Sequence, residues 1–145
     1  MADQKTILLV DDDRELVDGL RSLLEKQGYR VIQANDGHQA KTVIYNQKPD
    51  LVILDMMMPR MGGYPVLEHF RGKPDVPPII MITANEGSRH KAYAEYLGVI
   101  DYLRKPFATE RLLAAGETLG DPEVFEMRRG ARDRDLARRP DLETC

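Results

Sequence analysis

Acidic residues close two apolar stretches of the chain, at positions where a strand would end. Asp11, Asp12 and Asp13 follow the apolar run 6–10, and Asp55 follows the run 51–54. Unit charges about 4 Å apart repel by roughly 4 kcal/mol at an effective dielectric constant near 20, so such carboxylates need either a proton or a cation. Mg²⁺ takes oxygen ligands from one or two carboxylates together with a phosphate oxygen. The acids therefore indicate a Mg²⁺ site that handles a phosphoryl group.

Two further polar residues follow apolar runs in the second half of the chain. Thr83 comes after the run 79–82, and Lys105 comes after the run 101–104. A hydroxyl and an ammonium group are suited to bind the remaining oxygens of a phosphoryl group. Asp55 is then a candidate nucleophile, because a carboxylate that attacks phosphorus forms an aspartyl phosphate and needs mainly positioning and charge neutralisation.

The elements that must position these residues alternate along the chain. Short runs rich in Val, Ile and Leu predict strands at 6–10, 30–34, 51–54, 79–82 and 101–104. Helical patterns lie between them: one at 16–24 that ends at Gly28, one capped by Asp36, one with Pro65 in its first turn, one capped by Ser88 and one that starts at Thr109. The fourth has only Ala92, Tyr93, Tyr96 and Leu97 as its expected apolar face.

Strict alternation of strand and helix predicts right-handed crossovers and an α/β fold with a parallel sheet covered on both faces. In such sheets ligands bind beyond the carboxyl ends of the strands. All the polar residues singled out above fall at that edge.

Composition narrows the class of protein. The chain has 145 residues, 42% of them hydrophobic and 31% charged, which fits one soluble domain, and its net charge of −3 argues against nucleic-acid and anionic-membrane partners. The single cysteine, Cys145, permits no intrachain disulfide, and neither a signal peptide nor an apolar run of membrane-spanning length is apparent. We expect a cytoplasmic protein.

Four motifs occur in order: Asp11-Asp12, Asp55-Met56-Met57-Met58-Pro59-Arg60-Met61-Gly62-Gly63, Thr83-Ala84 and Lys105-Pro106-Phe107. Their spacing resembles the receiver domain of two-component response regulators, the CheY-like superfamily. The resemblance covers roughly residues 5–119 and implies a flavodoxin-like (βα)5 three-layer sandwich with strand order 2-1-3-4-5. The receiver domain is thus expected over 1–120. The charged tail 121–145 is expected to be mostly solvated, with a short helix at its start as one option; a frayed end, a partner-binding segment and a linker all stay open.

The resemblance also implies roles for individual residues. Asp55 would accept a phosphoryl group from a sensor histidine kinase or a histidine phosphotransfer protein. Mg²⁺ would be held by Asp12, Asp55, the Met57 carbonyl and, through water, Asp11. Thr83 and Lys105 would contact the phosphoryl group, Ala84 would leave it access, Tyr102 would turn inward as the aromatic switch, and the Lys105–Pro106 bond would be cis.

Output is implied at the surface formed by the fourth helix, the fifth strand and the fifth helix, where a downstream protein would bind. A phosphorylation-dependent homodimer is a further option, and direct nucleic-acid or membrane binding is not expected. The chain would catalyse only its own phosphorylation and dephosphorylation, so it is not expected to be a turnover enzyme.

The lifetime of the phosphorylated state is expected to depend on whether a side chain near the site can orient an attacking water. Met57 offers no polar group to orient an attacking water, whereas Asn85 does. We therefore expect Asn85→Ala to change the dephosphorylation rate, measured by following loss of the phosphorylated form. An unchanged rate would show that Asn85 does not set the lifetime.

Several alternatives accompany this interpretation. Asp13 is expected to cap the first helix rather than bind metal, and Met56, Met57, Met58 and Met61 are expected to pack rather than bind a soft metal. The order Asp11-x-Asp13, Thr83, Lys105 also loosely resembles haloacid-dehalogenase-type phosphatases, with Asp11 as nucleophile and Asp13 as acid/base. A receiver fold that serves only as an unphosphorylated interaction platform is the third option.

Overall fold

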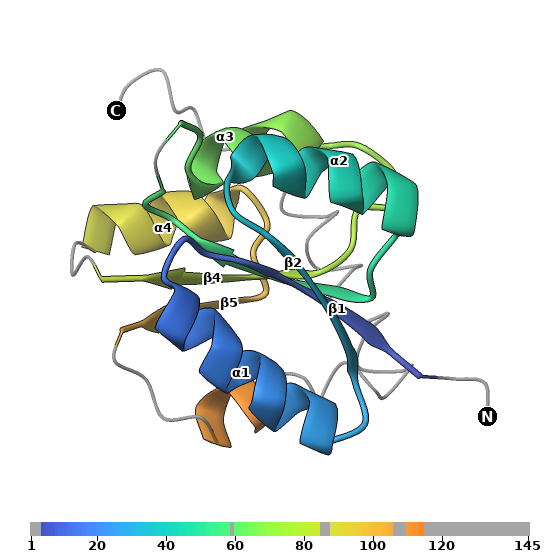
Figure 1. Cartoon of the computed structure of the whole chain (residues 1–145). Coiled ribbons are helices and arrows are strands. Elements are labelled where there is room, and N and C mark those ends of the chain that lie inside the picture. The colour runs from blue at the N-terminus through green and yellow to red at the C-terminus, as the bar shows by residue number, and fades with distance from the viewer. Residues whose placement is uncertain (1–3, 59, 85–87, 106–109, 115–145) are drawn as a thin grey trace, which may run out of the picture.

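The computed structural model describes residues 4–58, 60–84, 88–105 and 110–114. The elements alternate as β1 (Thr6–Val10), α1 (Arg14–Lys26), β2 (Arg30–Ala34), α2 (Gly37–Gln47), β3 (Leu51–Asp55), α3 (Gly63–Phe70), β4 (Ile79–Thr83), α4 (Ser88–Tyr96) and β5 (Asp101–Arg104). Residues 110–114 form a further helical turn. Figure 1 shows a central sheet with α1 and this turn on one face and α2, α3 and α4 on the other.

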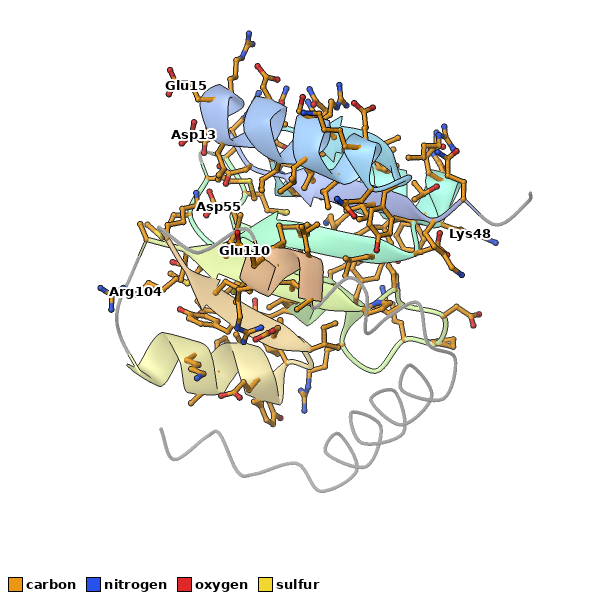
Figure 2. All side chains as sticks on the ribbon, turned by 90° about the horizontal axis from the view of Figure 1, so that it is seen from below. Asp13, Glu15, Lys48, Asp55, Arg104 and Glu110 are labelled. Atoms are coloured by element: carbon orange, nitrogen blue, oxygen red, sulfur yellow. The ribbon has the colours of Figure 1, made fainter. Side chains whose placement is uncertain are left out.

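The five strands are parallel and lie in the order β2-β1-β3-β4-β5. The register pairs Val10 with Leu54, Asp55 with Ile82, and Thr83 with Arg104, so four strands end level with one another. Figure 2 shows Asp13, Asp55 and Arg104 at this end of the molecule and Lys48 at the opposite end. The flavodoxin-like fold, its strand order and the edge expected to carry the polar residues are confirmed.

Both faces of the sheet are covered, and the strands are apolar for that reason. Alternate strand residues contribute to two buried clusters: Leu8, Val52 and Met81 belong to the cluster that packs α2, α3 and α4. Ile7 and Ile80 belong to the cluster that packs α1 and the turn at 110–114. Every residue of β3 and β4 is buried, as expected of strands between two helical layers.

Three helix ends follow their sequence signals. Asp13 accepts a hydrogen bond from the Leu16 amide at 3.2 Å, and Asp36 accepts one from the Gln39 amide at 3.0 Å, so both cap a helix as predicted. Gly28 has a φ of 96°, the left-handed conformation expected of a residue that ends a helix.

Other expectations need correction. β3 and β4 each extend one residue further than predicted and include the polar residues Asp55 and Thr83. In α4, Ala94 is buried and Ala92 is exposed, so the expected apolar face is wrong at that position. Ser88 is the first helical residue of α4 rather than the residue before it.

Some predictions fall outside the described residues, namely the start of the fifth helix at Thr109, its continuation beyond 114 and the tail 121–145. Among the helices that the structure describes, none is long and apolar enough to cross a bilayer.

Candidate functional site

Three carboxylates meet at the carboxyl edge of the sheet. Asp11 directly follows β1, Asp12 comes next, and Asp55 ends the adjacent strand β3. One carboxylate oxygen from each acid lies within 4.8 Å of those of the other two. Asp11 and Asp55 are only 4% and 3% exposed, while Asp12 is open to solvent. The structure thus brings together the three acids predicted from the sequence.

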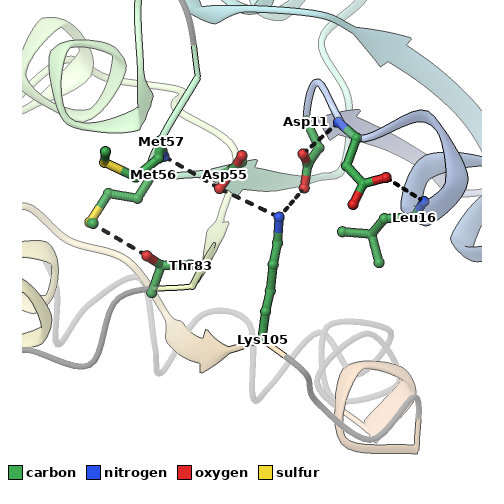
Figure 3. Close-up of polar contacts among 8 residues, drawn as sticks. Asp11, Leu16, Asp55, Met56, Met57, Thr83 and Lys105 are labelled. Atoms are coloured by element: carbon green, nitrogen blue, oxygen red, sulfur yellow. Dashed lines mark hydrogen bonds and ion pairs between the residues drawn. The ribbon is translucent and has the colours of Figure 1, made fainter.

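Lys105 enters this cluster from the end of β5. Its Nζ atom lies 2.8 Å from Asp11 Oδ2 and 3.7 Å from Asp55 Oδ1 (Figure 3). Burial lowers the pKa of Lys105, but its hydrogen bond to Asp11 and the charges of Asp11 and Asp55 together produce a net increase. The ammonium group therefore stays charged. Among the described residues it is the one cationic group that contacts Asp11 and Asp55.

The pKa of Asp55 is raised because one ammonium group does not balance the charge of the buried acids. Burial first, and the Asp11 carboxylate second, raise the pKa of Asp55 to about 7. Lys105 and the Met57 amide, which donates to Asp55 Oδ1 at 3.3 Å, oppose that shift without cancelling it. A divalent cation would remove the cost, because it favours the charged forms of all three acids. A donor set made only of oxygen atoms suits Mg²⁺, so the residues present fit that ion.

Thr83 ends β4 and is completely buried. Its hydroxyl donates to the Met56 sulfur at 3.9 Å, as Figure 3 shows. Met56 was predicted only to pack, and its contact with Thr83 adds a neighbour of the site that the sequence did not reveal. The one available signal was its position directly after Asp55.

Tyr102 pairs with Met81 of β4, and its side chain lies near the Thr83 hydroxyl. Its side chain is half-buried and its hydroxyl oxygen is fully buried. Burial raises the pKa of Tyr102, and the nearby Thr83 hydroxyl offsets part of that increase. The ring therefore lies inward in this structure.

The remaining predicted residues lie around the rim. Ala84 is exposed directly after Thr83 and adds no bulk there. The Met57 side chain is 61% exposed, so the expectation that it packs is wrong: it belongs to the loop between β3 and α3 and projects from the rim. Asn85 and Pro106 lie outside the described residues.

Asp13 contributes to the site through its backbone. Its amide donates to Asp11 Oδ1 at 3.0 Å, while its carboxylate caps α1. Both Asp11 oxygens are therefore engaged, one by the start of α1 and one by Lys105.

Comparisons with known proteins agree with this geometry. The family model described as the response regulator receiver domain matches residues 7–117. Response regulator MprA of Mycobacterium sp. (strain KMS) is 44% identical over 108 residues, which are 74% of this chain and 47% of that protein. The chain therefore spans about half the length of this curated relative.

Two solved structures resemble the whole fold. A CheY-like response regulator receiver domain protein from Methanospirillum hungatei JF-1 has a TM-score of 0.77 and 28% identity, over 86% of this chain and 99% of that one. The BeF3-activated N-terminal receiver domain of Klebsiella pneumoniae RstA has a TM-score of 0.72 and 30% identity, over 78% of this chain and 96% of that one. The family match, the relative and the strand order lead to one conclusion: the chain belongs to the response regulator receiver domain family of two-component signalling.

Proposed function

We propose that this chain accepts a phosphoryl group on Asp55 in a Mg²⁺-dependent reaction and signals by phosphorylation-dependent binding of a partner. The observation that carries the proposal is the cluster of Asp11, Asp12 and Asp55, with Lys105 in contact with two of these acids. The BeF3-activated state named for the similar Klebsiella domain supports the same chemistry.

The phosphoryl donor is a phosphohistidine of a sensor histidine kinase or of a histidine phosphotransfer protein. An Asp55 oxygen attacks the phosphorus, an oxygen–phosphorus bond forms, and the nitrogen–phosphorus bond breaks to release the imidazole. Asp12, Asp55, the Met57 carbonyl and Asp11 through water would hold Mg²⁺, which supplies charge neutralisation at the phosphoryl oxygens. Lys105, at 3.7 Å from Asp55 Oδ1, binds one of those oxygens.

Signalling then depends on Thr83 and Tyr102. Phosphorylation adds about −1.5 to −2 charges at the site. A phosphoryl oxygen accepts more strongly than a thioether sulfur, so the Thr83 hydroxyl leaves Met56 for it. Tyr102 lies beside Thr83, so the movement of Thr83 stabilises the inward position of the ring over its outward one and biases the surface of α4, β5 and the following helix toward its binding state.

That surface binds a downstream protein or a second phosphorylated copy of the chain, in the cytoplasm. The chain modifies only itself and turns over no separate substrate.

The phosphatase alternative requires Asp13 as acid/base. In the structure the Asp13 carboxylate accepts from the Leu16 amide at the start of α1, an engagement that favours the receiver interpretation.

The experiment is incubation with acetyl phosphate and Mg²⁺, followed by intact-mass measurement. We expect the wild type to gain one phosphoryl group and Asp55→Asn to gain none. Asp13→Asn is the matched control, since Asn also caps helices, and it should be modified like the wild type. A wild type that is never modified would favour the unphosphorylated interaction platform. Modification that depends on Asp11 but not on Asp55 would favour the phosphatase.

A further inference from the structure

The loop between β3 and α3, described at residues 56–58 and 60–62, carries Met57, whose amide contacts Asp55. We propose that Asp36 and Arg60 are positioning residues: their ion pair clamps this loop against the start of α2 and thereby sets the Met57 carbonyl for Mg²⁺ binding. The inference rests on the proposed function, which gives that carbonyl its role.

Two contacts join the start of α2 to the loop. Arg60 Nε lies 3.0 Å from Asp36 Oδ2, and the Gly37 amide donates to the Met61 carbonyl at 2.8 Å. Asp36 Oδ1 is taken by the Gln39 amide, so the two carboxylate oxygens have separate partners. The Gln39 hydrogen bond, assisted by the Arg60 charge, holds the pKa of Asp36 below its usual value, although burial opposes it. The buried Asp36 therefore meets Arg60 as a carboxylate.

Close packing connects the start of α2 and the loop to the end of β3, where Asp55 lies. A Cβ atom on Gly37 would lie 2.5 Å from Met61 Cγ, and one on Gly62 would lie 2.5 Å from the Met56 carbonyl oxygen. A Cβ atom on Gly63 would lie 2.7 Å from the Asp55 carbonyl oxygen. The Gly63 amide donates to the Met56 carbonyl oxygen at 3.0 Å. The backbone of the loop therefore packs directly against the backbone of Asp55 and Met56, next to Met57.

The backbone of Arg60 indicates what the ion pair is for. Its φ of 69° is left-handed, a conformation that is strained for a residue other than glycine and must be held by its surroundings. The Arg60 side chain is 68% exposed, so its ion pair adds little to global stability. The contact is therefore better explained by fixing the loop against the start of α2 than by global stability.

The test measures Mg²⁺ affinity by NMR titration of the ¹⁵N-labelled protein, following the amides of Asp12, Met57 and Met58. Arg60→Ala removes the ion pair, and Asp36→Asn keeps a capping oxygen while it removes the charge. We expect each variant to bind Mg²⁺ roughly 3- to 10-fold more weakly than the wild type, near the low end for partners that orient metal ligands. The double variant should be no weaker than either single one, because both changes break the same contact.

Arg111→Ala is the matched control, because it removes another exposed arginine–aspartate pair, Arg111 with Asp101 at the start of β5. The Mg²⁺ affinity of Arg111→Ala should equal that of the wild type. Urea unfolding should show that Arg60→Ala and Arg111→Ala have similar stabilities. Arg60→Gly accepts the left-handed backbone without the ion pair. We expect it to bind Mg²⁺ as weakly as Arg60→Ala.

Three results would overturn the inference while leaving the proposed function intact: unchanged affinity in Arg60→Ala or Asp36→Asn, additive losses in the double variant, or full affinity in Arg60→Gly. Lower stability with unchanged affinity would mean that the pair is merely structural. A wild type that binds no Mg²⁺ would overturn both the inference and the metal-dependent function.

Discussion

Asp55→Asn is expected to raise the free energy of unfolding of the metal-free protein by about 2 kcal/mol at pH 8, and to change it little at pH 4. The pKa of Asp55 rises from 3.8 in its ordinary state to about 7 in the folded chain. Between these values the folded state keeps a proton that the unfolded state has lost, so stability falls as pH rises through this window. Above pH 7 the penalty is complete, and Asn escapes it.

The magnitude follows from the same shift. Each pKa unit corresponds to about 1.4 kcal/mol, which sets an upper bound of roughly 4 kcal/mol. The shift is shared with the coupled Asp11 carboxylate, and solvent reaches the cluster at the exposed Asp12, so we expect about half of that bound. The measurement is urea unfolding, followed by circular dichroism, in metal-free buffer from pH 4 to pH 8.

Asp18→Asn is the control for this experiment, because Asp18 is an exposed acid of α1. Its stability profile should run parallel to that of the wild type. Added Mg²⁺ should stabilise the wild type more than Asp55→Asn, since the ion binds the folded state through the acid that the variant lacks. Parallel profiles for Asp55→Asn and the wild type would show that Asp55 is not under electrostatic strain.

Lys105→Met is expected to lower the free energy of unfolding, the opposite of the effect of Asp55→Asn. The substitution keeps the apolar stem but leaves the buried acids Asp11 and Asp55 without their cation. Removing one partner of a buried pair typically costs 3–5 kcal/mol, and the partial exposure of Lys105 lowers our expectation to about 2–4 kcal/mol at pH 7. Saturating Mg²⁺ should recover part of the loss, because it neutralises the same acids. Urea unfolding with and without Mg²⁺ provides the measurement.

Lys73→Met is the matched control. Lys73 Nζ contacts the Tyr45 hydroxyl and His69 Nε2, both at 3.2 Å, and these groups are not acids. Its replacement should change stability by no more than about 0.5 kcal/mol, as for most surface substitutions. Equal stability of the Lys105 and Lys73 variants would contradict the role of Lys105 as counter-ion.

The three central strands β1, β3 and β4 were predictable because they are buried on both faces and therefore read as continuous apolar runs. The cap positions of Asp13 and Asp36 were predictable because capping depends on residues only three positions away. The strand order could not be obtained from periodicity, which is local, and came instead from the resemblance to receiver domains. The grouping of Asp11, Asp12 and Asp55 followed from parallel strands that share one edge.

What was missed depends on residues far apart in the chain. The contacts of Thr83 with Met56 and of Arg60 with Asp36 join different elements, and neither pair has a spacing rule that a single sequence reveals. The exposure of Met57 reflects the direction of a loop rather than the polarity of its side chain. In α4, small and polar residues gave too little contrast to distinguish Ala94 from Ala92.

The position of β5 at the edge of the sheet has a consequence for local unfolding. β5 has four residues and pairs with β4 alone among the described strands, so fewer paired residues hold it than hold the other edge strand, β2. Opening would carry Lys105 away from Asp11, against the attraction of the acids. A proton or cation on those acids weakens that hold. The rate of amide hydrogen exchange in β5 therefore reports the charge state of a site that lies mainly on other strands.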